Sequence, residues 1–188
     1  TATRRTENAR VIATLPSANM IAVLLNADET NAHLASQQNE GLWLACVNAQ
    51  QACTISGTPE ATEKLAAKLE AEGVEFQFLR TWPASHSGLM EPILADFRAV
   101  FASMKLNPPK MAYLSNLYGD WIKPEQATSP DYWVAHLSQT VQFAGCMEKL
   151  LQDPNRVYVE IGPGHTLCNL LKRDVPPGQS VLALTSMP

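Results

Sequence analysis

The sequence predicts an α/β protein in which a small βαββαβ unit of the ferredoxin-like type precedes a larger layer of helices and strands. The first observation is the order of segments from Met20 to Arg80, which is strand, helix, strand, strand, helix, strand. The second is that strands alternate with helices after residue 88, as they do in parallel sheets. The third is that 188 residues with 46% hydrophobic content can bury a core.

The elements of the small unit are predicted from residue types and their spacing. Four short segments are apolar or alternate as strands do, namely residues 20–26, 42–48, 53–56 and 74–79. Helices are predicted at 3–14, 28–38 and 58–73. The last of these is the best defined, because Thr58 suits an N-cap, Pro59 the first turn and Gly73 the end.

The second half predicts an α/β layer. Helices are expected at residues 88–104, 131–137, 141–151 and 166–172. Strands are expected at residues 111–114, 156–161 and 181–184. Pro108 and Pro109 break the chain after the first helix, and no internal repeat is visible.

Composition excludes several classes of function. The net charge of −4 and the lack of a basic cluster exclude nucleic acid as a partner. The longest apolar runs are too short to span a membrane, and no secretory signal precedes them. Four cysteines without close spacing predict free thiols in a reducing cytoplasm, and they form no zinc-ligand pattern with the histidines, so no metal site is expected.

The chemistry that the residues themselves indicate is limited. No G-x-S-x-G nucleophile motif occurs, so this chain by itself is not expected to run acyl transfer through a covalent intermediate. His86, where the small unit ends and the next helix begins, could act as a general base, or it could be an ordinary surface or N-cap histidine. Gly162-Pro163-Gly164 could bind a phosphate or form a tight turn. Tyr132, Trp133 and His136 fit a packed core.

Several ordered segments resemble one known family. They are Asn48–Gly57, Trp82–Pro92 with its S-H-S-x-x-M-x-P pattern, Ser115–Gly119, Tyr132–Leu137, Val141–Phe143 and Glu160–Gly164. Together they are similar to malonyl-CoA:acyl carrier protein transacylases and, most of all, to acyltransferase domains of modular polyketide synthases. The resemblance covers the chain from about residue 10 to 186 and corresponds to the C-terminal portion of the domain, without the nucleophile segment.

The resemblance implies a fold and an activity. The fold would be a partial α/β-hydrolase-like large subdomain (residues 1–16 and 82–188) around a ferredoxin-like small subdomain (residues 17–81), with the site in the cleft between them. A serine would take the acyl group from acyl-CoA and pass it to the phosphopantetheine thiol of an acyl carrier protein. His86 would be the general base, and a backbone carbonyl near His136 would orient it. Acyl-CoA, the carrier protein and neighbouring synthase domains are the implied partners, and no cofactor stays bound.

The same resemblance assigns substrate-binding positions, some of which depart from the family. Members that load dicarboxylic units carry an arginine where this sequence has Asn8, and such a contact contributes about 1.5–3 kcal/mol. We therefore expect a preference for a monocarboxylic acyl group. Asn48 lies in a matching substrate-binding segment, whereas Pro83, Ala84 and Ser85, at the selectivity position, match neither the malonyl nor the methylmalonyl pattern.

Two alternatives remain open from the sequence. One is an editing acyl hydrolase with the same fold, and the other is a non-catalytic module that contacts a carrier protein or a neighbouring domain. A nucleophile motif upstream of Thr1 would favour either enzyme over the interaction module.

Overall fold

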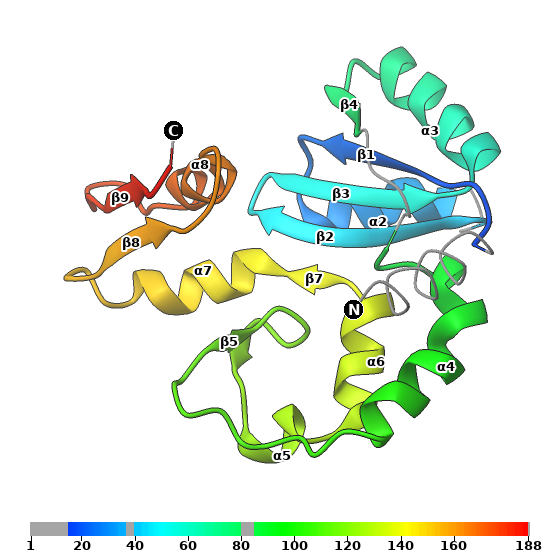
Figure 1. Cartoon of the computed structure of the whole chain (residues 1–188). Helices are drawn as coiled ribbons and strands as arrows, with labels where there is room; N and C mark the ends of the chain where they lie inside the picture. Colours follow the sequence, from blue (N-terminus) through cyan, green and yellow to red (C-terminus); the bar gives the residue numbers. More distant parts are fainter. Residues whose placement is uncertain (1–14, 37–39, 80–84, 188) are drawn as a thin grey trace.

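The small unit has the predicted order and a four-stranded antiparallel core. The computed structural model describes residues 15–36, 40–79 and 85–187 (Figure 1). The elements are β1 (Asn19–Val23), α2 (Ala27–Ser36), β2 (Leu42–Ala49), β3 (Ala52–Gly57), α3 (Pro59–Ala71) and β4 (Phe76–Leu79). The strands lie in the order β4-β1-β3-β2, with every neighbouring pair antiparallel. This confirms the βαββαβ order.

The core of the small unit lies between the sheet and its two helices. Ile21 and Ile55 of the sheet and Leu65 and Leu69 of α3 are fully buried in one cluster. The predicted start of α3 is confirmed, because the Thr58 hydroxyl accepts a hydrogen bond from the N–H of Ala61 at 3.3 Å. Side chains two residues apart on a strand share a face, so β1 and β3 each present one apolar row to these helices.

A fifth strand joins this sheet from the second half, where the sequence predicted a helix. β7 (Val141–Gln142) pairs in parallel with Cys46 and Val47 of β2, and α7 (Phe143–Leu151) begins only after it. The Thr140 hydroxyl donates to the carbonyl of Leu44 at 2.7 Å, just before β7. The edge of β2 offers unpaired backbone groups, and this tertiary pairing overrides the local helical pattern.

The rest of the second half contains short elements. They are η1 (Gly88–Met90), α4 (Glu91–Ala102), β5 (Leu114–Ser115), β6 (Asp120–Trp121), α5 (Pro124–Ala127), α6 (Pro130–Ser138), β8 (Val157–Glu160), α8 (Thr166–Arg173) and β9 (Leu182–Thr185). The predicted helix at 88–104 thus starts as a 3-10 turn, and the predicted strand at 111–114 contributes only its last residue to β5. β6 and α5 were not predicted, because elements of two to four residues carry no periodicity.

A parallel pair supports the α/β class in the second half. β8 and β9 pair in parallel with Val157 opposite Leu182, and α8 connects them. The pair lies at one end of the molecule, away from α3 and α4 (Figure 1). The α/β class is therefore confirmed. The subdomain boundaries at residues 16 and 81 stay a prediction. β7 belongs to the predicted large subdomain, but it pairs with β2 of the predicted small subdomain.

The cysteines are free thiols, as their spacing in the sequence predicted. All four cysteines are free; Cys53, Cys146 and Cys168 are buried, and Cys46 is half-buried. Burial raises the pKa of Cys46 and of Cys146 to about 11 each, so both stay protonated at neutral pH. In the described part of the chain, no helix combines the length and the apolar character needed to cross a membrane.

Candidate active site

His86 lies in a strained turn between β4 and η1. Its φ of 58° is in the left-handed region, where it is the only residue other than glycine among those that the structure describes. The N–H of His86 donates to the carbonyl of Leu137 at 3.0 Å, which fixes the turn against the end of α6. Such conformations cost about 1–3 kcal/mol and occur most often at functional sites.

The imidazole of His86 is held in one tautomer. Its Nδ1 lies 3.0 Å from the carbonyl oxygen of Gln139, just after α6. A carbonyl can only accept, so Nδ1 carries the hydrogen and Nε2 keeps the lone pair. The family resemblance predicted an orienting carbonyl near His136. The carbonyl of Gln139, three residues later, contacts Nδ1, and the carbonyl of His136 also acts on the ring. The lone pair on Nε2 can therefore accept a proton.

The surroundings of His86 keep it neutral. Burial lowers its pKa from the ordinary value of 6.5, and the nearby His136 ring lowers it further, while the carbonyls of Gln139 and His136 act in the opposite direction. The net shift is downward. The two imidazole rings meet edge to face with centroids 6.3 Å apart. At neutral pH the ring is therefore unprotonated, as a general base must be.

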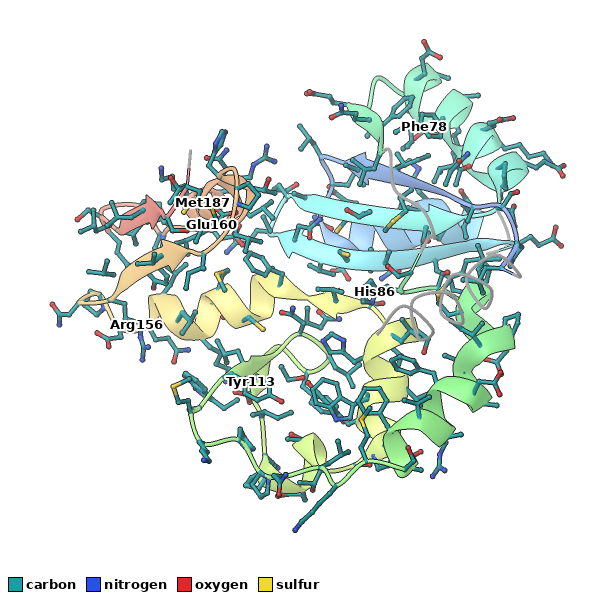
Figure 2. The ribbon with its side chains drawn as sticks, in the orientation of Figure 1. Phe78, His86, Tyr113, Arg156, Glu160 and Met187 are labelled. Atoms are coloured by element: carbon teal, nitrogen blue, oxygen red, sulfur yellow. The ribbon has the colours of Figure 1, made fainter. Side chains whose placement is uncertain are left out.

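A groove of about 580 Å³ runs beside His86. Its lining comes from α2, β2, the turn before η1, the segment between β5 and β6, and the chain from the end of α6 to β7. These residues are Asn31, Leu34, Leu42, Trp43, Leu44, His86, Leu117, Ser138, Gln139, Thr140 and Gln142. Figure 2 shows His86 between the small sheet and the helices of the second half. The groove thus has one wall from each half of the chain, with His86 on it.

Two further predicted site residues, Ser85 and Asn48, belong to the described part of the chain, and neither lines this groove. Asn8, Pro83 and Ala84 lie outside the described residues. Ser85 is half-buried next to His86 but does not line the groove. The Asn48 side chain donates to the hydroxyl of Thr54 at 2.9 Å, within the sheet, and is likewise absent from the lining. The substrate-binding roles assigned to these residues stay predictions.

His136 belongs to an aromatic cluster behind the groove. Tyr132 is buried and its hydroxyl lies 2.9 Å from that of Ser115, which confirms it as a core residue. Trp133 is half-buried and stacks on Phe101, with centroids 5.4 Å apart and an angle of 11° between the rings. The His136 ring contacts both Tyr132 and Trp133. Its side chain is a packing neighbour of His86.

The sequence missed three residues that define the groove. Trp43 and Leu117 line it, and Gln139 contributes the orienting carbonyl. A backbone carbonyl has no sequence signal, since every residue carries one. Trp43 gave no signal either, because an aromatic residue in an apolar strand is ordinary core material.

The Gly162-Pro163-Gly164 segment forms a turn. Gly162 and Gly164 have φ of 146° and 85°, which side chains rarely adopt. The N–H groups of Leu167 and Cys168, at the start of α8, donate to the carboxylate of Glu160 at 3.1 and 2.9 Å. The chain's own carboxylate occupies the place that a phosphate would take, so the tight-turn interpretation is favoured.

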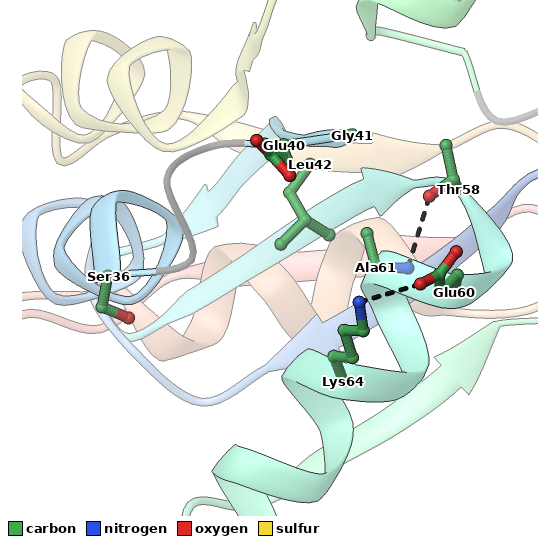
Figure 3. A pocket seen from close by; sticks show the side chains of 8 residues that line it. All are labelled: Ser36, Glu40, Gly41, Leu42, Thr58, Glu60, Ala61 and Lys64. Carbon is green, nitrogen blue, oxygen red and sulfur yellow. Dashed lines mark hydrogen bonds and ion pairs between the residues drawn. The ribbon is translucent and has the colours of Figure 1, made fainter.

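A second cavity, of about 460 Å³, lies at the start of α3 (Figure 3). Of the charged residues that line it, Glu40, Glu60 and Lys64, the last two pair at 2.8 Å, and this contact lowers the pKa of Glu60. A carboxylate held in this way is a poor proton acceptor. Among the residues that the structure describes, no group of three or more His, Cys, Asp or Glu side chains could hold a metal ion.

Known proteins match this chain over nearly its whole length. The model of the acyl transferase domain matches residues 2–184. The chain is 34% identical over 167 residues to polyketide synthase GfsB of Streptomyces halstedii, covering 88% of this chain and 3% of that protein. It is 30% identical over 174 residues to the phenolphthiocerol synthesis polyketide synthase type I Pks15/1 of Mycobacterium bovis, covering 92% of this chain and 8% of that protein.

Solved structures give the same result. The acyl transferase domain of SpnD, in complex with 2-(pent-4-yn-1-yl)malonyl, matches with a TM-score of 0.87 and 36% identity over 97% of this chain. The acyltransferase domain from the second module of the salinomycin polyketide synthase matches with a TM-score of 0.85 and 30% identity over 95% of it. This chain spans 43% and 41% of those two solved chains. It therefore belongs to the acyl transferase domain family and resembles the acyl transferase domains of modular polyketide synthases.

Proposed function

We propose that this chain contributes the general base His86 to an acyltransferase domain of a polyketide synthase. The complete domain would move an acyl group from acyl-CoA to the phosphopantetheine thiol of an acyl carrier protein. The observation that carries the proposal is the hydrogen bond between Nδ1 of His86 and the carbonyl of Gln139, at 3.0 Å. It leaves Nε2 of a neutral ring as the proton acceptor beside the groove.

In each half-reaction that nitrogen takes up one proton and gives it back. In the first, a serine hydroxyl attacks the thioester carbonyl and gives its proton to His86, and the imidazolium then protonates the CoA thiolate that leaves. In the second, the pantetheine thiol gives its proton to His86 and attacks the acyl-serine, and the imidazolium returns the proton to the serine oxygen as it leaves. The 188 residues contain no G-x-S-x-G segment, so in this proposal the serine comes from residues beyond them.

The proposal includes the partners and the substrate class that the family resemblance implies. The partners are acyl-CoA, the carrier protein and the adjacent synthase domains, in the cytoplasm, with no bound cofactor. Asn8, at the position of the arginine in dicarboxylate-loading members, supports a monocarboxylic acyl group. Hydrolysis of the acyl-enzyme, in place of transfer, would give a free acid, and product analysis distinguishes the two outcomes.

The test is His86→Ala in a domain that joins this chain to its nucleophile segment. We expect kcat/KM for acyl transfer to fall about 10²–10⁴-fold, because removal of a general base has this effect. Burial lowers the pKa of His86, so the rate of the unmodified domain should decline on acidification only below pH 6.5. Transfer from radiolabelled acyl-CoA to the carrier protein gives both results.

His165→Ala is the matched control, since His165 is exposed at the start of α8 and does not line the groove. Its transfer rate should equal that of the unmodified domain. An undiminished rate in His86→Ala would refute the assignment.

A further inference from the structure

Trp43, in strand β2, is part of the groove wall that the small sheet contributes. In β2 the flanking Leu42 and Leu44 belong to the core on the helix-covered side of the sheet. Side chains alternate along a strand, so Trp43 lies on the opposite side, toward the segment that carries His86. Trp43 and His86 both line the groove of about 580 Å³. The indole is half-buried, so it retains contact with the open space.

The position of the indole is limited by the backbone at Gly88. A Cβ atom at Gly88 would lie 2.8 Å from Cζ2, 2.9 Å from Cε2 and 3.0 Å from Nε1 of Trp43. The ring therefore already touches the main chain two residues after His86. It cannot retreat toward Gly88 to make room for a larger ligand. Because this segment is also fixed by the hydrogen bonds of His86, the wall is rigid on that side.

The chemistry of the lining indicates what the wall would contact. Leu34, Leu42, Leu44 and Leu117 add apolar groups to the lining of the groove, and the amides of the lining belong to Asn31, Gln139 and Gln142. An alkyl chain gains free energy from contact with such leucine and indole surfaces. The acyl part of a thioester is the alkyl part of the substrate, and it must reach the atom that reacts beside His86.

We propose that Trp43 is a specificity-determining residue that limits the length of the acyl group beside His86. The proposal rests on the proposed function. A rigid indole excludes volume that a longer acyl chain would need, whereas a short one fits beside it. In an apolar pocket, one methylene changes the selectivity of an enzyme about 10–200-fold.

The test compares acetyl-CoA with hexanoyl-CoA as substrates of the complete domain. We expect Trp43→Ala to raise the ratio of kcat/KM for hexanoyl-CoA over acetyl-CoA about tenfold or more, and Trp43→Phe to raise it less. Trp121→Ala is the matched control, because Trp121 in β6 is exposed and does not line the groove. That control should leave the ratio unchanged.

Gly88→Ala tests the same wall from the other side. The new methyl group would lie within 3.0 Å of the indole, so the ring must move away from residue 88. Under the proposal this movement narrows the groove, and the ratio should fall below that of the unmodified domain. The double variant Gly88→Ala/Trp43→Ala has no ring to displace, and its ratio should match that of Trp43→Ala.

An unchanged ratio in Trp43→Ala would overturn the proposal, even if both rates fell, because an equal loss indicates a structural role alone. If thermal unfolding shows that Trp43→Ala does not fold, the ratio is measured in Trp43→Phe and Trp43→Leu, and an unchanged ratio in both variants would overturn the proposal. An unmodified domain that transfers no acyl group from acetyl-CoA, hexanoyl-CoA or malonyl-CoA would refute the proposed function instead, so the two failures are distinguishable.

Discussion

The small sheet and the β8–β9 pair both contain strands with apolar side chains, but these side chains differ greatly in burial. In the small sheet Ile21, Val23 and Ile55 are at most 1% exposed. In the β8–β9 pair Val157 and Val159 are 57% and 55% exposed, and their partners in β9 are similarly open. Helices α2 and α3 cover the small sheet, whereas in the described part of the chain the main cover of both strands of the pair is the short helix α8 (Figure 1).

This difference in burial shows that a sheet needs covering helices to form a buried core. The small sheet is covered by helices that lie between its own strands in sequence, so one short stretch of chain supplies both layers. Parallel strands normally require cover on both faces, and the described residues supply little on one face of β8–β9. Apolar side chains contribute to stability only when they leave water. We therefore expect stability to depend on the small unit.

The largest expected effect is that of Ile55→Ala. This side chain is fully buried in the core of the small unit, so its truncation should lower the free energy of unfolding of the 188-residue chain by about 2–5 kcal/mol. Urea denaturation followed by circular dichroism measures the change. Leu184→Ala, at a position that is 47% exposed, is the comparison and should cost much less. Equal costs for the two variants would contradict the difference between the sheets.

Two valine-to-threonine substitutions, one in each sheet, test the difference in burial without changing the shape of the side chain. Val23→Thr would place a hydroxyl in the core and should cost about 1–3 kcal/mol of unfolding free energy if the hydroxyl finds no partner. Val159→Thr, in an exposed position, should change it by less than about 0.5 kcal/mol. The same urea experiment gives both values. A larger cost of Val159→Thr in the complete domain than in this chain would show that further protein covers that face.

The smallest expected effect is local and depends on pH. Hydrogen bonds from the N–H groups of Cys168 and Leu167 lower the pKa of Glu160 below its ordinary 4.5. A lowered folded-state pKa means that the stabilisation is present above pH 4.5 and is lost as the pH falls through the lowered value. Hydrogen-exchange protection of the two amides should therefore decrease on acidification to about pH 3.

In Glu160→Gln the protection of these amides should be lower at neutral pH and nearly independent of pH. Glu125→Gln, in α5, is the control and should behave like the unmodified chain. The same pH dependence in Glu160→Gln as in the unmodified chain would assign the effect to another group.

Part of the fold followed from the sequence because local signals agreed with it. Thr58, Pro59 and Gly73 act within a few residues, so the limits of α3 could be predicted closely. Residues 141–142 could not, because their strand state depends on Cys46 and Val47 of β2 as partners. For the site, the motif around residue 86 identified the histidine. The substrate-binding role of Asn48 stays a prediction, and the structure adds that its side chain donates to Thr54.

By itself, the sequence determined the βαββαβ order, the α/β class, the free thiols and the candidate base, because each depends on residue type or short-range spacing. Only the tertiary structure decided that the carbonyl of Gln139 holds Nδ1 of His86, that Trp43 lies against Gly88, and that β7 extends the small sheet. Each of these contacts joins segments more than forty residues apart through backbone groups or shape. Neither a contact between backbone groups nor a close fit of shapes leaves a periodic signal in the sequence of a single chain.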